Sequence, residues 1–325
     1  MLEKEFHVTA LGELLIDMTP YGTSDQGNSL LEANPGGAPC NVLAMVSKLG
    51  GKTAFIGKVG KDAFGDLLEE TLLSQNINTE GLVKDPRYCT TLAFVHLDSK
   101  GERSFSFYRK PGADMMLEQQ EINQSLIKKA KIFHFGTLSM TNEPVLSATK
   151  FAIDLAMESG CIISFDPNIR PLLWDSLENA KAQMEYGFSK CHVLKVSEEE
   201  IQLATGINDA GKAVQVLCNK FPNIKLVLVT AGEKGSFFYH NNVQGFVEPF
   251  LHDETIDTTG AGDAFMGSCL YEIAKCGLSS LNEEKLYHIL RFANAAASLV
   301  ITKKGALKAM PNRDTVEDFI KKYEN

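Results

Sequence analysis

The sequence predicts an α/β protein with a doubly wound, mostly parallel sheet, helices on both faces and a small second β-sheet. Two observations support the main sheet: short apolar runs alternate with longer runs of helical spacing, and hydrophobic residues fill 44% of the 325 positions. A third observation supports the small sheet. Apolar and polar residues alternate over 90–109, which predicts a hairpin inside the strand–helix series.

The first predicted element is a buried strand over 6–18, which bends at Gly12 and continues past the carboxylate of Asp17. The polar segment 20–35 predicts a loop or a short exposed hairpin. Beyond it, helices are predicted from apolar residues three and four apart, and strands from short apolar runs that end in turns. These elements are helix 40–49, strand 54–59, helix 63–75, hairpin 90–109, strand 131–135, helix 143–158, strand 161–165, helix 176–188, strand 192–196, helix 198–204, helix 209–221, strand 225–230, hairpin 235–250, helix 264–276, helix 283–301 and a helix near 312–323.

The chain is predicted to form one domain over 1–325, because no internal repeat, low-complexity tract or linker divides it. The segments near 14–35 and 88–112 are predicted to build a lid that lies over the main sheet. In open α/β sheets, ligands bind beyond the carboxyl ends of the strands. A functional site is therefore expected at that edge.

Composition excludes some classes of partner. A formal net charge of -9 and a pI of about 5.4 argue against a general binder of nucleic acids or anionic membranes. The seven cysteines are scattered, with no Cys-x-x-Cys pair, and predict reduced core residues in a cytoplasmic protein. No apolar run approaches the roughly 18 residues of a membrane span, and no signal peptide is apparent.

The stretch 257–263, Asp-Thr-Thr-Gly-Ala-Gly-Asp, joins an extended segment to an apolar helical run. The first turn of a helix has free N–H groups and the positive end of the helix dipole, and glycine lets an anion approach them. A carboxylate at such a place, Asp263, is suited to take a proton from a hydroxyl that attacks phosphorus. The alternative is that Asp263 is an N-cap and the glycines only make a tight turn.

Other polar residues gather where predicted strands end. Taken singly, each is best read as a capping or turn residue, but their joint placement at one edge favours a site. Arg109 and Arg170 are candidates for an acidic or phosphorylated group, with an ion pair and a loop contact as the alternatives. The residues at this edge include Asp17, Gly36, Gly37, Asn41, Asn168, Arg170, Lys195, Ser197, Glu200, Thr230, Gly232 and Gly235.

Two familiar nucleotide motifs are missing. Gly51-Lys52-Thr53 is similar to the end of a Walker A motif, but Val46 stands where that motif needs glycine. No Gly-x-Gly-x-x-Gly follows the first strand. His134 and His192 have no partner at metal-ligand spacing and are predicted to be core histidines.

Two signatures, in order, resemble those of the PfkB (ribokinase-like) carbohydrate kinases. They are Asp-Thr-Thr-Gly-Ala-Gly-Asp-Ala-Phe at 257–265 and GGAPCNVLAMVSKLGGKTAFIGKVGKDAFG at 36–65. The resemblance covers essentially the whole chain. It implies an α/β kinase domain with a small β-sheet lid, and ATP-dependent phosphorylation of a sugar hydroxyl.

The resemblance also implies roles for single residues. Asp263 is the expected catalytic base, and Glu200 matches the acidic end of an Asn-x-x-Glu motif associated with Mg²⁺, here through water. Ser197 replaces the asparagine of that motif, which weakens a direct magnesium contact. The other implied sets are Gly260, Ala261 and Gly262 for the anion hole; Asp17, Gly36, Gly37, Asn41, Arg109, Asn168 and Arg170 for the sugar; Lys195, Thr230, Gly232, Gly235 and Asn294 for ATP; and Asp257 and Thr259 for a monovalent cation such as K⁺.

Within the family the motifs look most like those of bacterial fructokinases, which implies phosphorylation of the 6-hydroxyl of fructose. A 2-keto-3-deoxygluconate kinase is the nearest alternative, although that group more often has tyrosine in place of Phe107. A nucleoside kinase of the same fold would use Phe105 and Phe107 to clamp a base. A sugar-sensing homologue without turnover is a further alternative, and a homodimer through the lid is a plausible assembly.

Overall fold

The computed structural model describes residues 3–97, 103–251 and 254–324. Within these ranges nine strands form the main sheet, in the order β13-β12-β11-β10-β9-β8-β1-β4-β5. The strands from β11 to β5 run parallel, and β12 and β13 extend the sheet in antiparallel pairing. This confirms the predicted fold class. The strands are β1 Phe6–Leu11, β4 Thr53–Gly60, β5 Ile77–Asp85, β8 Ala130–Phe135, β9 Ile162–Phe165, β10 Val193–Ser197, β11 Leu226–Thr230, β12 Ser236–His240 and β13 Val243–Val247.

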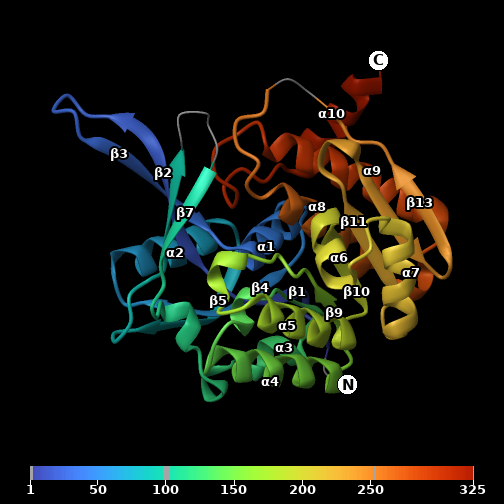
Figure 1. The fold of residues 1–325 in the computed structure, drawn as a ribbon, viewed down its shortest axis with the longest axis horizontal. Coiled ribbons are helices and arrows are strands. Elements are labelled where there is room, and N and C mark those ends of the chain that lie inside the picture. Colours follow the sequence, from blue (N-terminus) through green and yellow to red (C-terminus); the bar gives the residue numbers. More distant parts are fainter. Residues whose placement is uncertain (1–2, 98–102, 252–253, 325) are drawn as a thin grey trace.

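Helices cover both faces of this sheet (Figure 1). The alternation of β11 shows why: Leu226 and Leu228 enter one hydrophobic core, and Val227 and Val229 enter the other. The first core contains α1 Ala38–Lys48, α2 Ala63–Ser74, α8 Ala261–Cys276, α9 Glu283–Val300 and α10 Arg313–Glu324. The second contains α3 Gln124–Lys128, α4 Val145–Glu158, α5 Leu177–Lys190, α6 Glu198–Thr205 and α7 Ala210–Lys220.

A second sheet of four strands stands beside the main body, in the order β3-β2-β6-β7 (Figure 1). Its strands are β2 Leu15–Thr23, β3 Ser29–Gly36, β6 Leu92–Leu97 and β7 Arg103–Tyr108. They come from the two segments predicted to build the lid, so the predicted small sheet is confirmed. The grouping of the whole chain into a single domain stays a prediction.

The predicted single strand over 6–18 is wrong in one respect. The chain leaves the main sheet after Leu11 and enters the lid at Leu15. Gly12 lies at this junction, where a Cβ atom would come 2.5 Å from Cγ of Pro39 in α1. The turn therefore packs directly on the start of α1, and Asp17 belongs to the lid instead of the main sheet.

Two further elements differ from the prediction. Helix α8 begins at Ala261 and not at 264, so 261–263 form its first turn. Strand β5 was not predicted, because its pattern of buried and half-buried residues has no clean period. His134 is a core histidine as expected: its Nδ1 lies 2.9 Å from the Ser164 hydroxyl, and burial lowers its pKa to about 3.

Across the described ranges, every helix is too short or too polar to cross a bilayer.

Candidate active site

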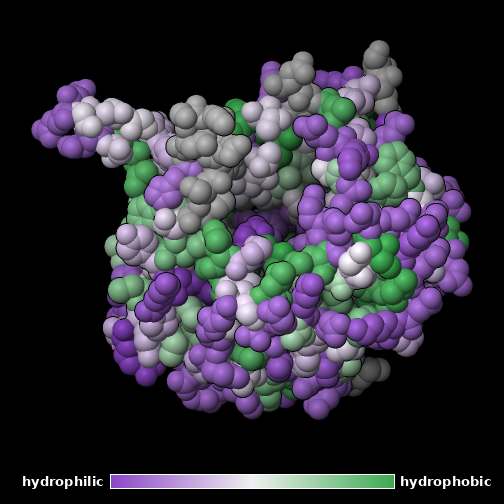
Figure 2. Space-filling view, viewed as in Figure 1, coloured by the Kyte–Doolittle hydropathy of each residue, from purple (hydrophilic) through white to green (hydrophobic). Residues whose placement is uncertain are grey.

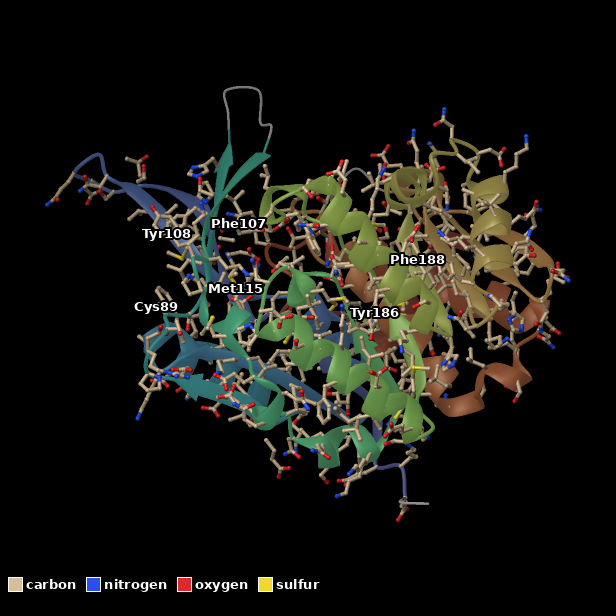
Figure 3. The ribbon with its side chains drawn as sticks, turned by 60° about the horizontal axis from the view of Figure 1, so that its bottom comes forward. Cys89, Phe107, Tyr108, Met115, Tyr186 and Phe188 are labelled. Carbon is tan, nitrogen blue, oxygen red and sulfur yellow. The ribbon has the colours of Figure 1, made fainter. Side chains whose placement is uncertain are left out.

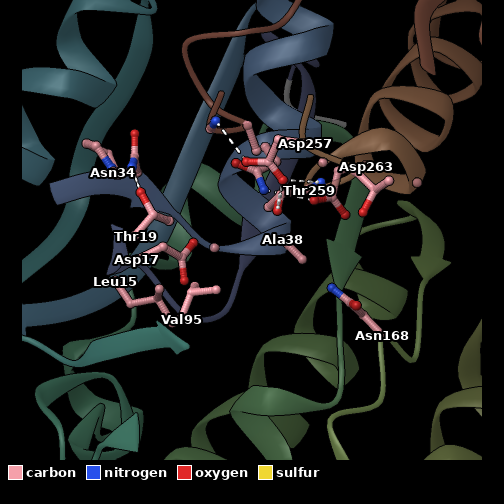
Figure 4. Close-up of a pocket in the computed structure, with 18 of the residues that line it drawn as sticks. Leu15, Asp17, Thr19, Asn34, Ala38, Val95, Asn168, Asp257, Thr259 and Asp263 are labelled. Carbon is pink, nitrogen blue, oxygen red and sulfur yellow. Dashed lines mark hydrogen bonds between the residues drawn. The ribbon is translucent and has the colours of Figure 1, made fainter. Parts of the chain in front are cut away.

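A cavity of about 630 Å³ lies between the lid sheet and the carboxyl ends of the main strands. Figure 2 shows it as a hollow with a hydrophilic floor, and Figure 4 shows its lining from inside. The side chain of Phe107 points toward this cavity, whereas its neighbour Tyr108 lies on the opposite side of β7 (Figure 3). The lid contributes Leu15, Asp17, Thr19, Asn34, Val95 and Phe107 to the wall.

The amino end of helix α8 faces this cavity. Gly260, which precedes it, has a left-handed backbone (φ 84°) and no side chain to cap the helix. The Ala261 N–H reaches the Thr258 carbonyl at 3.4 Å, but within the described residues no acceptor lies at the N–H of Gly262 or Asp263. This end of the helix therefore offers free donors and a positive dipole to an anion.

Asp263 lies in the first turn of α8 and lines the cavity. Its Oδ2 accepts a hydrogen bond of 2.8 Å from Nδ2 of Asn41 in α1. Burial raises the pKa of Asp263 to about 6, against the lowering effect of the Asn41 bond and of Lys195. The carboxylate is thus ionised at neutral pH but more basic than an exposed aspartate, which suits a general base.

Asn41 is buried, and its Oδ1 has no hydrogen-bond partner within the described residues. An unpaired buried acceptor costs free energy, so the site is built to receive a donor there. Because Asn41 lines the cavity, a ligand hydroxyl can supply that donor. Asn41 would then contact the ligand and the carboxylate of Asp263 at once.

Asp17 faces the same cavity from β2. Burial raises its pKa to about 7, which Arg170 opposes and Asp257 reinforces. Gly36 leaves room for this carboxylate, since a Cβ atom there would lie 2.6 Å from Oδ2 of Asp17. Asp17, Gly37, Asn41, Asn168 and Arg170 line the cavity, and Gly36 lies directly behind Asp17.

The loop before α8 is tied to the loop after α9. Asp257 Oδ1 accepts from the N–H and the hydroxyl of Thr259, at 3.0 and 2.7 Å. Its Oδ2 accepts from the N–H of Gly305 at 3.1 Å. Asp257 and Thr259 both line the cavity, so oxygen ligands suited to a hard cation lie next to the anion site. Within the described residues, no cluster of three or more His, Cys, Asp or Glu side chains forms a metal site.

A second cavity of about 440 Å³ adjoins the first and shares Asn168, Arg170 and Lys195 with it. Lys195 is buried and forms an ion pair of 3.0 Å with Asp166. A Cβ atom on Gly262 would lie 3.1 Å from the Lys195 ammonium, which places this cation beside the first turn of α8. Burial disfavours the charge, but Asp166 and then Glu200 raise the pKa of Lys195 above its ordinary value, so it stays protonated.

Glu200 lines the second cavity but is held by backbone contacts. Its Oε1 accepts from the N–H of Ile169 at 2.9 Å, and its Oε2 accepts from the N–H of Ser197 at 2.8 Å. The Ser197 hydroxyl accepts from the N–H of Glu200 in return, which completes a capping box at the start of α6. Serine therefore has a structural use at this position.

The two arginines predicted at the sugar site have different surroundings. Arg170 is exposed and lines both cavities. Arg109 is buried, and its Nε donates to Asp114 at 2.7 Å while an Nη atom donates to the Leu138 carbonyl at 2.9 Å. Arg109 is not among the residues that line either cavity. Asp114 neutralises this guanidinium, and the assignment of Arg109 to the sugar stays a prediction.

Of the residues predicted at the nucleotide, Lys195 lines both cavities, whereas Thr230, Gly232, Gly235 and Asn294 line neither. Thr230 pairs across strands with Ser197, which lines the second cavity. Gly235 (φ 104°) closes a tight hairpin, and Nδ2 of Asn294 donates to the Val247 carbonyl at 3.2 Å. The assignment of Thr230, Gly232, Gly235 and Asn294 to the nucleotide stays a prediction.

Sequence reasoning missed Glu13, which lines the cavity and is 4% exposed. Its Oε1 accepts from the N–H of Ala38 at 2.9 Å, and burial raises its pKa to about 7. A glutamate inside the apolar run of 10–16 is the signal that could have identified it, because such a charge is seldom buried without a partner.

Comparison with known proteins agrees with this geometry. The model of the "pfkB family carbohydrate kinase" matches residues 6–313. Fructokinase-2 of Oryza sativa subsp. japonica is 43% identical over 323 residues, which cover 98% of this chain and 95% of that protein. A fructokinase with bound ATP from Xylella fastidiosa has a TM-score of 0.90 and 34% identity, and the match covers 98% of this chain and 99% of that one.

A double mutant of the Vibrio cholerae O395 fructokinase, in its fructose, ADP and potassium ion bound form, has a TM-score of 0.87. It is 34% identical, and the match covers 98% of this chain and 99% of that one. Each match covers 98% of this chain, so it includes the lid as well as the main sheet. The chain therefore belongs to the pfkB family and is an ATP-dependent carbohydrate kinase.

Proposed function

We propose that this protein transfers the γ-phosphoryl group of ATP to the 6-hydroxyl of fructose. One observation carries the proposal: a basic carboxylate, Asp263, and free N–H groups of the same helix turn face one cavity. The similar structures from Xylella and Vibrio hold ATP, or fructose with ADP, which supports the same ligands here.

Asp263 acts as the general base in this proposal. Its Oδ2 accepts a hydrogen bond from Asn41, which leaves Oδ1 to accept the proton of the attacking hydroxyl. The N–H groups of Gly262 and Asp263, with the helix dipole, stabilise negative charge on the transferring phosphoryl group. Gly260 and Ala261 shape this anion hole, and the Lys195 ammonium adds a fixed positive charge beside it.

The nucleotide would extend from the anion hole through the second cavity toward Thr230 and Asn294. Both Glu200 oxygens accept backbone N–H groups, so this carboxylate fits a contact with Mg²⁺ through water better than direct ligation. Bound Mg²⁺ would offset the charge of the ATP phosphates. Asp257 and Thr259 would hold K⁺ near the anion hole, and this is consistent with the potassium of the Vibrio structure.

The acceptor cavity favours a neutral sugar over a sugar acid. Four carboxyl groups, Glu13, Asp17, Asp257 and Asp263, line it, whereas Arg109 is already paired with Asp114. A carboxylate substrate would meet repulsion from those groups. Of the cations that line the cavity in the described residues, Lys195 is already paired with Asp166, which leaves the exposed Arg170 and Lys304 to offset that repulsion. This argues against 2-keto-3-deoxygluconate. For the nucleoside alternative, Phe107 lines the cavity, but the side chain of Phe105 lies outside the described residues.

Assembly and location are also proposals. Large apolar side chains of the lid are exposed, among them Tyr21, Leu30, Leu31 and Tyr108, and a homodimer through the lid would cover them. All seven cysteines are free, which suits a reducing cytoplasm.

A coupled ADP-release assay tests the proposed function. Fructose, 2-keto-3-deoxygluconate and adenosine are compared with and without K⁺, and the product with fructose is identified by NMR. We expect turnover with fructose only, phosphorylation at the 6-position and activation by K⁺. Preference for the sugar acid or for adenosine would overturn the substrate assignment, and no turnover with any acceptor would favour a sensing role.

A further inference from the structure

The amino end of α1 is capped by a side chain from another part of the chain. Gly37, the residue before this helix, has no side chain that could cap it. The N–H of Ala38 instead donates to Oε1 of Glu13 at 2.9 Å. Glu13 lies between β1 and β2 and is 4% exposed. A buried carboxylate at this place satisfies an orphan donor and interacts favourably with the helix dipole.

Close backbone packing holds this contact in place. A Cβ atom on Gly37 would come 2.4 Å from the carbonyl oxygen of Glu13. On the other side, a Cβ atom on Gly12 would come 2.5 Å from Cγ of Pro39. The junction between the main sheet and the lid is thus fitted against the first turn of α1, with the Glu13 carboxylate at their interface.

The same end of α1 carries the side chain that contacts the base. Asn41 lies three residues after Ala38, within the first turns of the helix, and its Nδ2 donates to Oδ2 of Asp263 at 2.8 Å. This hydrogen bond to the charged form lowers the pKa of Asp263. A small shift or fraying of the end of α1 would therefore change the ionisation of the base.

We propose that Glu13 is a positioning residue, which caps α1 and so holds Asn41 in register with Asp263. The inference deepens the proposed function, because it assumes that Asp263 is the base of that reaction. It assigns Glu13 no contact with the reacting atoms. What matters is the reach of its side chain to the Ala38 N–H.

Charged groups of both signs act on Glu13. Burial raises its pKa to about 7, the N–H contacts and Arg109 lower it, and Asp114 raises it. Arg109 and Asp114 form an ion pair with each other, and the Cys40 thiol of α1 also faces Glu13. A substitution that removes the Glu13 charge therefore leaves no unpaired cation behind.

Three substitutions separate reach from charge. Glu13→Gln keeps an acceptor at the same distance without the charge, Glu13→Asp keeps the charge but is too short, and Glu13→Met removes both. The readout is the acid limb of the pH profile of kcat/KM with fructose, since only ionised Asp263 accepts a proton. We expect the limb to move to higher pH by about half a unit or more in Glu13→Asp and Glu13→Met, and to stay in Glu13→Gln.

Asn41→Leu should move the acid limb in the same direction. If Glu13 acts through Asn41, the double variant Glu13→Asp/Asn41→Leu shifts no further than Asn41→Leu alone. An additive shift, an unmoved limb in Glu13→Asp, or a shift in Glu13→Gln but not in Glu13→Asp would overturn the proposal. Thermal unfolding of each variant checks that the fold is kept, and Glu13→Asp carries the test if Glu13→Met does not fold.

A measurement without turnover separates this inference from the proposed function. In protein labelled with ¹³C at aspartate carboxyl groups, the Asp263 resonance is assigned by its loss in Asp263→Asn. Its titration is then compared between the wild type and the Glu13 variants. A raised Asp263 pKa in Glu13→Asp supports the positioning role even if fructose is not the substrate, whereas an unchanged pKa refutes it even if fructose is phosphorylated.

Discussion

Helices α1 and α8 begin in the same way and face the same cavity, but their amino ends are used differently. Each follows a glycine with positive φ, Gly37 at 128° and Gly260 at 84°, and neither glycine can cap its helix. At α1 the first donor is taken by a carboxylate, Glu13. At α8 the N–H groups of Gly262 and Asp263 have no acceptor within the described residues.

This difference shows how one local motif can serve two ligands. With its dipole offset by Glu13, the end of α1 is suited to neutral hydroxyl groups, for which Asn41 offers a free acceptor. The end of α8 keeps its positive potential, and Lys195 adds to it. In the proposed function, phosphate is therefore attracted to α8 and the sugar to α1, and Asp263 lies between them.

Removal of the base should have the largest effect. Asp263→Asn keeps the shape of the side chain and its place beside Asn41 but cannot accept a proton. We expect kcat to fall by about 10²–10⁴. The ADP-release assay measures the loss, and circular dichroism shows whether the fold is kept. Turnover close to that of the wild type in a folded variant would remove Asp263 from the role of base.

Distortion of the amino end of α8, which has the free N–H groups, should have the next largest effect on kcat. Gly260→Ala places a Cβ atom 2.5 Å from Cβ of Ala306, so the first turn of α8 must move. We expect kcat to fall by about 10–100-fold, because small displacements of catalytic groups are costly.

The carboxyl end of α6 offers a matched control for this substitution. Gly206 has the same left-handed backbone, with a φ of 73°, but a Cβ atom there would have no neighbour within 4 Å. Gly206→Ala should share the strain of a left-handed alanine, about 1–2 kcal/mol, and keep its kcat. Equal losses of kcat in both variants would mean that general destabilisation, and not the anion hole, explains the effect of Gly260→Ala.

The features of the amino end of α8 were easier to predict than those of the amino end of α1. Free N–H groups at a helix start follow from local sequence, so Gly260, Gly262 and Asp263 could be assigned from one stretch. Glu13 contacts Ala38 across 25 positions, and no local pattern shows which donor a distant carboxylate will meet.

Arg109 shows the same limit of local reasoning. Its neighbour Asp114 is only five positions away, yet the buried ion pair depends on where η1, Ala113–Met116, places this carboxylate. The predicted fold class was correct because periodicity is local. The strand over 6–18 was divided wrongly because the step from the main sheet to the lid depends on packing at Gly12.

The proposed role of Asp17 in sugar binding can be tested through folding stability as well as through activity. The pKa of Asp17 is raised to about 7, above an unfolded value of about 3.9, so the folded state binds more protons between these pH values. Folding stability should therefore fall as the pH rises from about 4 to 7. Asp17→Asn removes this cost, and we expect it to be about 1–2 kcal/mol more stable than the wild type at pH 8 but not at pH 4.

The same variant should bind fructose more weakly, with KM raised about tenfold or more. Urea unfolding at the two pH values gives the stability, and the ADP-release assay gives KM. A variant that is less stable at pH 8 would show that Asp17 is held by favourable contacts in the free protein. The expected combination, gained stability with lost affinity, is typical of a residue placed for a ligand.

The smallest effect is expected from Arg170, the exposed cation that lowers the pKa of both Asp17 and Asp263. Arg170→Gln should move the acid limb of kcat/KM upward by about 0.2–0.5 pH unit at low ionic strength. Because salt screens exposed charges, the difference from the wild type should shrink at about 1 M salt. Lys220→Gln, which removes an exposed cation paired with Glu185, serves as the control and should leave the limb in place. A shift in Arg170→Gln that persists at high salt would mean that the guanidinium contacts the ligand directly. Arg170 would then act as a hydrogen-bond donor to the ligand, like the N–H groups at the amino end of α8, and not through its long-range charge.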